Sequence, residues 1–164
     1  MAELLARERV KLVIADVNEA RAAVLTKSLG AKQVGGADVP QVEADIFAPC
    51  AFGAVLNDLT IPRLKARLVC GGANNQLQDE QHGEALRQCG IVYAPDYIVN
   101  AGGIINIAAE YLGENTPQGE VRVGEIAPRI LSILRDAAAS GLPSNVVADD
   151  LAHRTVVGAH RDAA

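Results

Sequence analysis

Aromatic residues are scarce in this sequence of 164 residues: they make up 3% of it, and tryptophan is absent. The core must therefore be built from alanine, valine, isoleucine and leucine, a mixture typical of helices packed on parallel strands. Fifteen basic residues stand against 20 acidic ones, which gives a net charge of −5. Because binding to a phosphate backbone requires a basic surface, nucleic acid is not expected as a partner.

Long apolar runs are also lacking. The longest, Ile98–Leu112, contains Asn100, Asn106 and Glu110 and is shorter than the roughly 20 residues that a membrane-spanning helix needs. The N-terminus is charged from Glu3 onward and offers no signal-peptide core. We therefore expect a cytoplasmic protein without a membrane partner.

Cysteine is rare and widely spaced. Cys50, Cys70 and Cys89 form no Cys-x-x-Cys pair, and no histidine lies at ligand spacing from them. We interpret the three residues as buried free thiols in a reducing compartment. Neither a disulfide nor a metal site is expected.

Short apolar runs alternate with helix signals in the first hundred residues. β-Branched residues dominate Val10–Ala15, and a helix is expected over 20–29 with Asn18 as its N-cap and Gly30 as its C-cap. Three similar runs follow, at Asp45–Pro49, Leu68–Gly71 and Ile91–Pro95. The alternation predicts an α/β protein with a Rossmann-like parallel sheet and flanking helices.

Helical periodicity replaces this rhythm after residue 99. The pattern predicts one helix from Asn100 to near Gly113 and a second over 123–134, with Pro128 kinking it or delaying its start. After a break at 141–143, residues 144–160 predict a last, weaker helix. We expect these C-terminal helices, over 100–164, to pack on the domain formed by residues 1–99 and to complete a single domain.

Asp16 follows the first predicted strand. In a dinucleotide-binding βαβ unit, an acidic residue after the second strand accepts hydrogen bonds from the adenosine ribose. The glycine-rich turn should lie about 20 residues earlier, upstream of Met1, and no Gly-x-Gly-x-x-Gly occurs in the sequence. On this interpretation, residues 2–8 are the end of the helix that follows the glycine-rich turn, and the sheet lacks its first strand. On local rules alone, Asp16 could equally end a strand before a turn.

Three segments carry a resemblance to known enzymes. They are Asp45-Ile-Phe-Ala-Pro-Cys-Ala51, Gly71-Gly-Ala-Asn-Asn-Gln76 and Tyr93-Ala-Pro-Asp-Tyr-Ile-Val-Asn-Ala-Gly-Gly103. In order and spacing, these segments resemble the C-terminal, nucleotide-binding part of the glutamate/leucine/phenylalanine/valine amino-acid dehydrogenases, most of all the leucine-specific members. The resemblance extends from about Val10 to Asp149.

The resemblance implies NAD-dependent oxidative deamination of a branched-chain L-amino acid, of the leucine or valine type, to the 2-oxo acid and ammonia. It also implies homo-oligomeric assembly, which is usual in the family. The residues that it places at the cofactor are Asp16, Cys50, Ala51 and Asn75, and those at the amino-acid substrate are Asn75, Ile104 and Ile107. Without the resemblance, the spacing of Ile104 and Ile107 is that of ordinary core residues.

Three polar residues also have simpler interpretations. Asn100 is expected as a helix N-cap. His82 follows a polar helix start and is expected to face solvent rather than to act in catalysis. Asp96 either orients a loop or only begins a turn.

The sequence supplies no catalytic residue. The family uses lysines from a glycine-rich region as base and carboxylate anchor, but Lys11, Lys27, Lys32 and Lys65 are the only lysines here, and solvated side chains explain all four. We therefore expect the chain alone to be inactive. The alternative is a non-catalytic nucleotide-binding module, or a subunit that pairs with a separate N-terminal chain.

Overall fold

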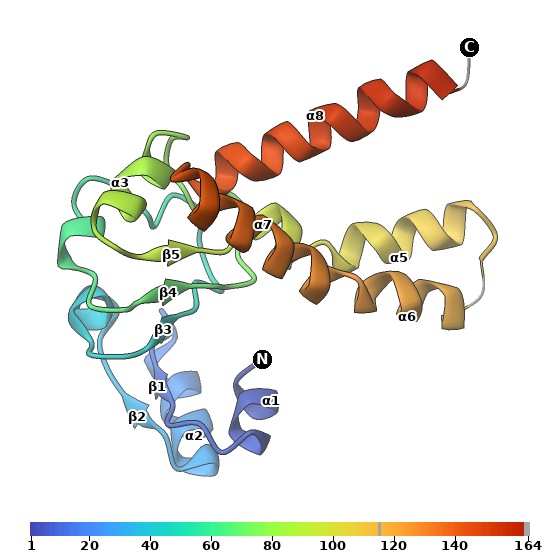
Figure 1. Ribbon diagram of the computed structural model, residues 1–164. Helices are drawn as coiled ribbons and strands as arrows, with labels where there is room; N and C mark the ends of the chain where they lie inside the picture. The colour runs from blue at the N-terminus through green and yellow to red at the C-terminus, as the bar shows by residue number, and fades with distance from the viewer. Residues whose placement is uncertain (115, 163–164) are drawn as a thin grey trace. The chain divides into compact units, whose positions relative to one another are not determined.

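The computed structural model describes residues 1–114 and 116–162, whose contacts group into two compact units, Met1–Glu43 and Ala44–Ala164. Each unit is described by itself (Figure 1). The expected division at residues 99 and 100 stays a prediction.

The first unit pairs two short parallel strands beside a capped helix. The Asn18 side chain accepts a hydrogen bond from the Arg21 amide at 2.9 Å, and Gly30 ends the helix in the left-handed conformation, with φ 63°. Both predicted caps are confirmed. The elements are α1 (Ala2–Arg7), β1 (Val13–Ile14), α2 (Glu19–Leu29), β2 (Lys32–Gln33) and the 3-10 helix η1 (Gly36–Gln41).

The second unit contains a three-stranded parallel sheet of order β3-β4-β5. Its strands are β3 (Ile46–Phe47), β4 (Leu68–Val69) and β5 (Val92–Tyr93), accompanied by η2 (Ile61–Arg63) and α3 (His82–Gln88). Phe47 pairs with Val69, and Val69 with Tyr93, so the three strands end level with one another. Figure 1 shows β4 between its two neighbours.

One apolar cluster, aliphatic except for Tyr93, forms the core around this sheet. Its buried members are Leu56, Ile61, Val69, Leu86, Ile91 and Tyr93. Parallel strands and helices along the chain confirm the α/β prediction. The finer expectations, a Rossmann-like sheet without its first strand, stay predictions.

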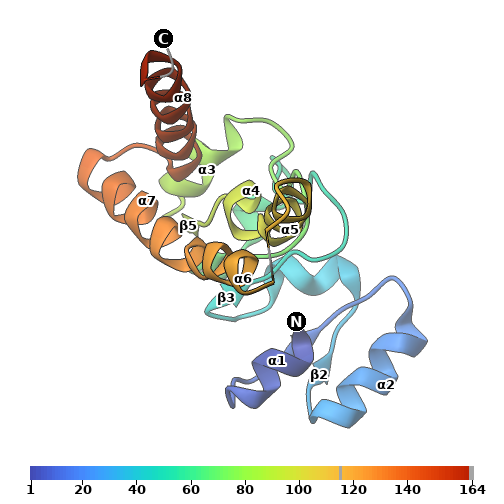
Figure 2. The same ribbon diagram turned by 90° about the vertical axis from the view of Figure 1, so that its right-hand side faces the viewer.

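Within the described residues, β5 is followed by the helices α4 (Asp96–Val99), α5 (Gly102–Tyr111), α6 (Thr116–Gly124), α7 (Ile126–Ser140) and α8 (Ser144–Asp162). The predicted amphipathic stretch is divided at Glu125, and Pro128 lies in the first turn of α7, as a delayed start requires. Figures 1 and 2 show α5 and α6 side by side. None of the helices within residues 1–114 and 116–162 combines the length and apolarity needed to cross a membrane.

The helices α7 and α8 share a second apolar core. Ile133 of α7 is buried with Val147 and Ala148 of α8, and Ile98 of α4 packs against them. Helix α8 also contacts β5 and α3. The C-terminal helices are therefore attached to the sheet at the strand that leads into α4.

Candidate functional site

A cleft of about 880 Å³ opens beyond the carboxyl ends of β4 and β5. Ligands bind at this edge in open α/β sheets, because loops and helix N-termini converge there. Among its lining residues are Asn75, Tyr93, Asp96, Tyr97 and Asp149, contributed by the loop after β4, by β5, by α4 and by α8. Of the predicted site residues, Asn75 lies in this cleft.

Asn75 has a left-handed backbone, with φ 52°. Its amide donates to the Asp96 Oδ2 atom at 2.9 Å, and its carbonyl accepts a hydrogen bond from the Ala54 amide at 2.7 Å. The next residue, Gln76, is fully buried and braces the loop by donating to the Gly71 carbonyl at 2.8 Å. The Asn75 side-chain amide makes no hydrogen bond to any described residue, so both its donor and its acceptor are available to a ligand.

Asp96 and Tyr93 form a buried pair at the base of the cleft. The Tyr93 hydroxyl donates to the Asp96 Oδ1 atom at 2.5 Å and accepts from the Asp96 amide at 3.3 Å. Burial, and then the hydrogen bond to Asp96, raise the pKa of Tyr93. The sequence left open whether Asp96 orients a loop or begins a turn, and its carboxyl group contacts the Asn75 loop directly.

Helix α8 is hydrogen-bonded to the same region. The Ser144 hydroxyl donates to the Tyr93 carbonyl at 2.6 Å. The Tyr97 hydroxyl donates to the Asp149 Oδ1 atom at 2.7 Å and lies 3.2 Å from the Asn145 carbonyl. Burial, and then the hydrogen bond to Asp149, raise the pKa of Tyr97. These bonds connect α8 to residues on both sides of Asp96.

The raised pKa values of Tyr93 and Tyr97 predict alkaline destabilisation. Unfolded tyrosines have a pKa of about 10, whereas the folded pair stay protonated above it, so unfolding releases protons and the free energy of unfolding falls as pH rises above about 10. We expect Tyr97→Phe to reduce this fall, and Tyr111→Phe, at a residue 91% exposed, to leave it unchanged. Urea unfolding at about pH 8 and about pH 10.5 measures the difference. An equal fall in Tyr97→Phe and the parent chain contradicts the expectation.

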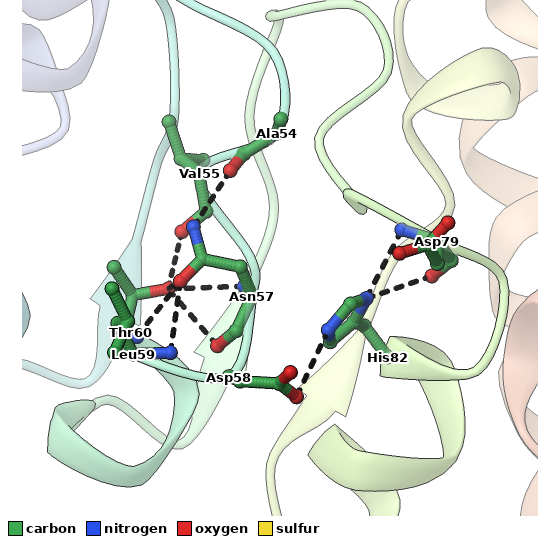
Figure 3. A network of polar contacts seen from close by, with 8 residues as sticks. All are labelled: Ala54, Val55, Asn57, Asp58, Leu59, Thr60, Asp79 and His82. Carbon is green, nitrogen blue, oxygen red and sulfur yellow. Dashed lines mark hydrogen bonds and ion pairs between the residues drawn. The ribbon is translucent and has the colours of Figure 1, made fainter.

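His82 joins two loops below the cleft. It is 1% exposed, so the expectation that it faces solvent is wrong. Its Nδ1 atom accepts from the Asp79 amide at 3.0 Å, and its Nε2 atom lies 3.3 Å from the Asp58 Oδ1 atom (Figure 3). With Nδ1 accepting, Nε2 carries the proton that is donated to Asp58. The polar residues at this helix start suggest exposure, but the ring is buried and contacts both the adjacent turn at Asp79 and Asp58, which is distant in sequence.

The loop that carries Asp58 is itself held by local hydrogen bonds. Asn57 accepts from the Thr60 amide at 3.1 Å through its side-chain oxygen and donates to the Ala54 carbonyl at 2.9 Å (Figure 3). An isolated parallel bridge between Leu56 and Leu77 then joins this loop to the segment after Asn75. The backbone on which Asn75 lies is therefore fixed by two neighbouring segments.

Cys50 and Ala51 follow β3 and are exposed. The Cys50 thiol donates to the Ala48 carbonyl at 3.2 Å. All three cysteines are free thiols, but Cys50 and Cys89 are exposed and Cys70 is half-buried, which corrects the expectation that all three are buried. Burial, and then the neighbouring Cys50, raise the pKa of the Cys70 thiol, which disfavours the nucleophilic thiolate.

Ile104 and Ile107 lie on one exposed face of α5, 65% and 62% exposed. They are therefore not the ordinary core residues that their spacing alone indicates. Asn100 is likewise not a helix N-cap, because that position of α5 is taken by Ala101. Asn100 ends α4, and its side chain donates to the Asn74 side-chain oxygen at 2.5 Å.

Asp16 is exposed beyond the end of β1 in the first unit. Its Oδ1 atom accepts from the Asn18 amide at 2.8 Å, and its second carboxylate oxygen makes no hydrogen bond to a described residue. The carboxylate thus orders the turn before α2 and keeps an oxygen available. Asp16, Cys50, Ala51, Asn75, Ile104 and Ile107 remain predicted site residues.

The structure adds Asp96, Tyr93 and Asn100 to the candidate site. Their sequence signal is the segment that begins at Tyr93. The sequence predicts for Asp96 a loop-orienting role or a turn and for Asn100 a helix N-cap, but it gives no role for Tyr93. Within the described part of the chain, no group of histidine, cysteine and acidic residues has the arrangement of a metal site.

Known proteins similar to this chain are amino-acid dehydrogenases. The pattern described as "Glutamate/Leucine/Phenylalanine/Valine dehydrogenase" matches residues 2–140. Leucine dehydrogenase of Thermoactinomyces intermedius is 46% identical over 149 residues, which are 91% of this chain and 41% of that enzyme. Phenylalanine dehydrogenase of Lysinibacillus sphaericus is 39% identical over 166 residues, covering 96% of this chain and 43% of that enzyme.

A solved structure gives the same relationship. The crystal structure of L-tryptophan dehydrogenase from Nostoc punctiforme matches with a TM-score of 0.92 and 37% identity, covering 97% of this chain and 48% of that one. The chain thus spans less than half the length of each of these three relatives. It belongs to the glutamate/leucine/phenylalanine/valine dehydrogenase family.

Proposed function

We propose that this chain is the C-terminal, nucleotide-binding part of an NAD-dependent enzyme that deaminates a branched-chain L-amino acid, of the leucine or valine type, to the 2-oxo acid and ammonia. The observation that carries the proposal is the Asn75 loop. This loop presents the Asn75 side-chain amide, which makes no hydrogen bond to a described residue, beyond the carboxyl end of β4. The chain that carries it is 46% identical to a leucine dehydrogenase. A primary amide can donate and accept at once, which suits an amino acid or a nicotinamide amide.

The residues assigned to the cofactor have suitable chemistry. The oxygen of Asp16 without a hydrogen bond would accept from the adenosine ribose hydroxyls, while Cys50 and Ala51 would line the cofactor's path beyond β3. Asn75 would face the reacting end of the cofactor and the substrate. NAD, when bound, supplies the hydride acceptor.

Substrate preference is assigned to the exposed apolar face of α5. Ile104 and Ile107 offer β-branched walls that suit an aliphatic side chain and narrow a pocket against an aromatic ring. A hydrophobic pocket discriminates by only about 1–3 kcal/mol per methylene, so leucine and valine are both expected to be accepted.

The described cleft offers no lysine as base or carboxylate anchor. Lys11, Lys27, Lys32 and Lys65 are all exposed, and none of them lines the cleft. We therefore expect no turnover by the chain itself, and only weak nucleotide binding, because the sequence contains no Gly-x-Gly-x-x-Gly turn to hold the pyrophosphate. This observation also favours the second candidate, a non-catalytic nucleotide-binding module or a subunit that pairs with a separate catalytic chain.

Titration with NAD tests the cofactor assignment. A ligand that binds only the folded chain raises the melting temperature as its concentration rises, and we expect this rise with NAD. Asp16 should make NADP at least about tenfold weaker than NAD, because the carboxylate repels the 2′-phosphate. Asp16→Ser should weaken that preference, whereas Asp38→Ser, at another exposed carboxylate of the first unit, should keep it. A melting temperature that NAD leaves unchanged would refute the assignment.

Turnover in a mixture separates a chain that takes part in catalysis, within the enzyme or as a paired subunit, from a non-catalytic module. The chain is mixed with the part of the Thermoactinomyces intermedius leucine dehydrogenase that lies outside the match, and NADH formation is followed with L-leucine, L-valine and L-phenylalanine. Turnover that appears only in the mixture, and is higher with leucine and valine than with phenylalanine, supports a part in the enzyme, either as its C-terminal part or as a paired subunit. NAD binding without turnover in the mixture supports the non-catalytic module.

A further inference from the structure

We propose that Asp96 is a positioning residue, whose buried carboxyl group fixes the left-handed backbone of Asn75 and thereby aims the Asn75 side chain into the cleft. The effect of Asp96 on ligand binding rests on the proposed function. The effect of Asp96 on the backbone of Asn75 is independent of that function.

The first step concerns why Asn75 needs to be held. Its φ of 52° is a conformation that residues other than glycine rarely adopt, although asparagine tolerates it better than most. A free loop would sample other conformations, and the side chain would then point elsewhere. The hydrogen bond of the Asn75 amide to Asp96, at 2.9 Å, is available only while this backbone conformation and this loop position are kept.

The second step concerns whether Asp96 is itself fixed. Its side chain is nearly inaccessible, and both carboxyl oxygens are used: Oδ2 accepts from Asn75, and Oδ1 accepts from the Tyr93 hydroxyl at 2.5 Å. Tyr93 is buried in the core cluster. Because a buried carboxyl group without partners is costly, rotation of Asp96 away from either donor is disfavoured. Asp96 therefore transmits the position of β5 to the loop after β4.

The third step is the support from the surrounding backbone. At the other end of α4, the Asn100 side chain donates to the Asn74 side-chain oxygen at 2.5 Å, so the two ends of this helix hold consecutive residues of the loop. On the opposite side, a Cβ at Gly53 would lie 2.8 Å from the Asn75 carbonyl oxygen. The backbone of Asn75 is thus enclosed from both sides, while its side chain remains free for a ligand.

Amide hydrogen exchange measured by NMR on the folded full chain tests the proposal. We expect Asp96→Ala to speed exchange of the Asn75 amide about tenfold, the loss of one hydrogen bond, relative to the Cys70 amide, which donates to Phe47 in the sheet. Asp149→Ala is the matched control, because it removes another tyrosine-bonded carboxylate of the same cleft that does not contact Asn75. The control should leave Asn75 exchange unchanged.

A merely structural role of Asp96 gives a different result. In that case Asp96→Ala would raise the exchange rates of the Asn75 and Cys70 amides alike, or Asp96→Ala and Asp149→Ala would raise the rate at Asn75 equally. Either outcome overturns the proposal. If Asp96→Ala does not fold, the nearly isosteric Asp96→Leu decides: it fills the space of the carboxyl group but offers the Asn75 amide no acceptor, so faster exchange at Asn75 is again expected. Unchanged Asn75 exchange in a folded Asp96→Leu chain would then be the contrary result.

NAD titration of the same samples separates this proposal from the proposed function. If the parent chain binds NAD, Asp96→Ala should weaken binding at least about threefold, because Asn75 is no longer preorganised. If the parent chain does not bind NAD, the proposed function fails, while the exchange rates still decide the positioning of Asn75. Faster Asn75 exchange with unchanged NAD affinity would overturn the role of Asp96 in ligand binding.

Discussion

Replacing Gly71 with alanine is expected to lower the free energy of unfolding of the second unit by about 3 kcal/mol. A Cβ at this position would lie 2.2 Å from the carbonyl oxygen of Pro49 and 2.5 Å from its nitrogen. Both atoms belong to backbone, which cannot move aside as the end of a flexible side chain can. The Pro49 carbonyl also accepts from the Ala73 amide at 2.9 Å, so relief of the clash would break this bond.

The neighbouring glycine supplies the control for this substitution. Gly72 is exposed, and a Cβ there would meet nothing within 4 Å. We expect Gly72→Ala to change stability by less than about 1 kcal/mol, since alanine mainly restricts the unfolded chain. Urea unfolding followed by circular dichroism compares the two variants with the parent chain. Equal stability of Gly71→Ala and Gly72→Ala would show that β3 and β4 can separate without cost.

Truncation of Leu86 should have an effect of similar size. Leu86 lies on α3, is 0% exposed and packs in the aliphatic core of the second unit. Leucine-to-alanine substitutions at such positions cost about 2–5 kcal/mol, from lost burial and from the cavity that remains. With aromatic residues at 3% of the sequence and no tryptophan, few bulky side chains are at hand to fill that cavity. We therefore expect a loss of about 4 kcal/mol.

Two further variants make the Leu86 result interpretable. Leu59, 79% exposed, is the matched site, and Leu59→Ala is expected to change stability by less than about 0.5 kcal/mol. Leu86→Met keeps most of the volume and should cost less than about 1.5 kcal/mol. The three free energies of unfolding come from the same denaturant titration. A loss at Leu86→Ala no larger than at Leu59→Ala would mean that the core does not depend on α3.

Features set by neighbouring residues were predictable from the sequence. The helix α2 has both predicted caps, because Asn18 and Gly30 act within one turn of the helix ends. The later strands were located by their apolar runs, but each pairs over two residues only, since a run also includes flanking residues without a ladder partner. Strand β2 was missed, because Lys32 and Gln33 are polar and exposed and give no hydrophobic signal.

Features set by distant residues were not predictable in the same way. His82 is buried, and one of its polar contacts is with Asp58, 24 positions away. Asn100 satisfies the polar side chain of Asn74 rather than a helix end. The resemblance to known dehydrogenases identified the Asn75 segment, but local pattern contained nothing about its left-handed backbone or its contact with Asp96.

The two hydrogen bonds that join the ends of α4 to the loop of Asn74 and Asn75 also bear on the order in which this unit folds. Its hydrogen bonds join residues 21 and 26 positions apart, so neither partner can be ordered by local interactions. Closing a loop of this length costs chain entropy, and the hydrogen bonds that offset this cost can form only after the loop has closed. We therefore expect the loop after β4 to take its final form only once β4 and β5 have paired. An ordered Asn75 marks the completion of tertiary structure in this unit rather than the formation of its helices and strands.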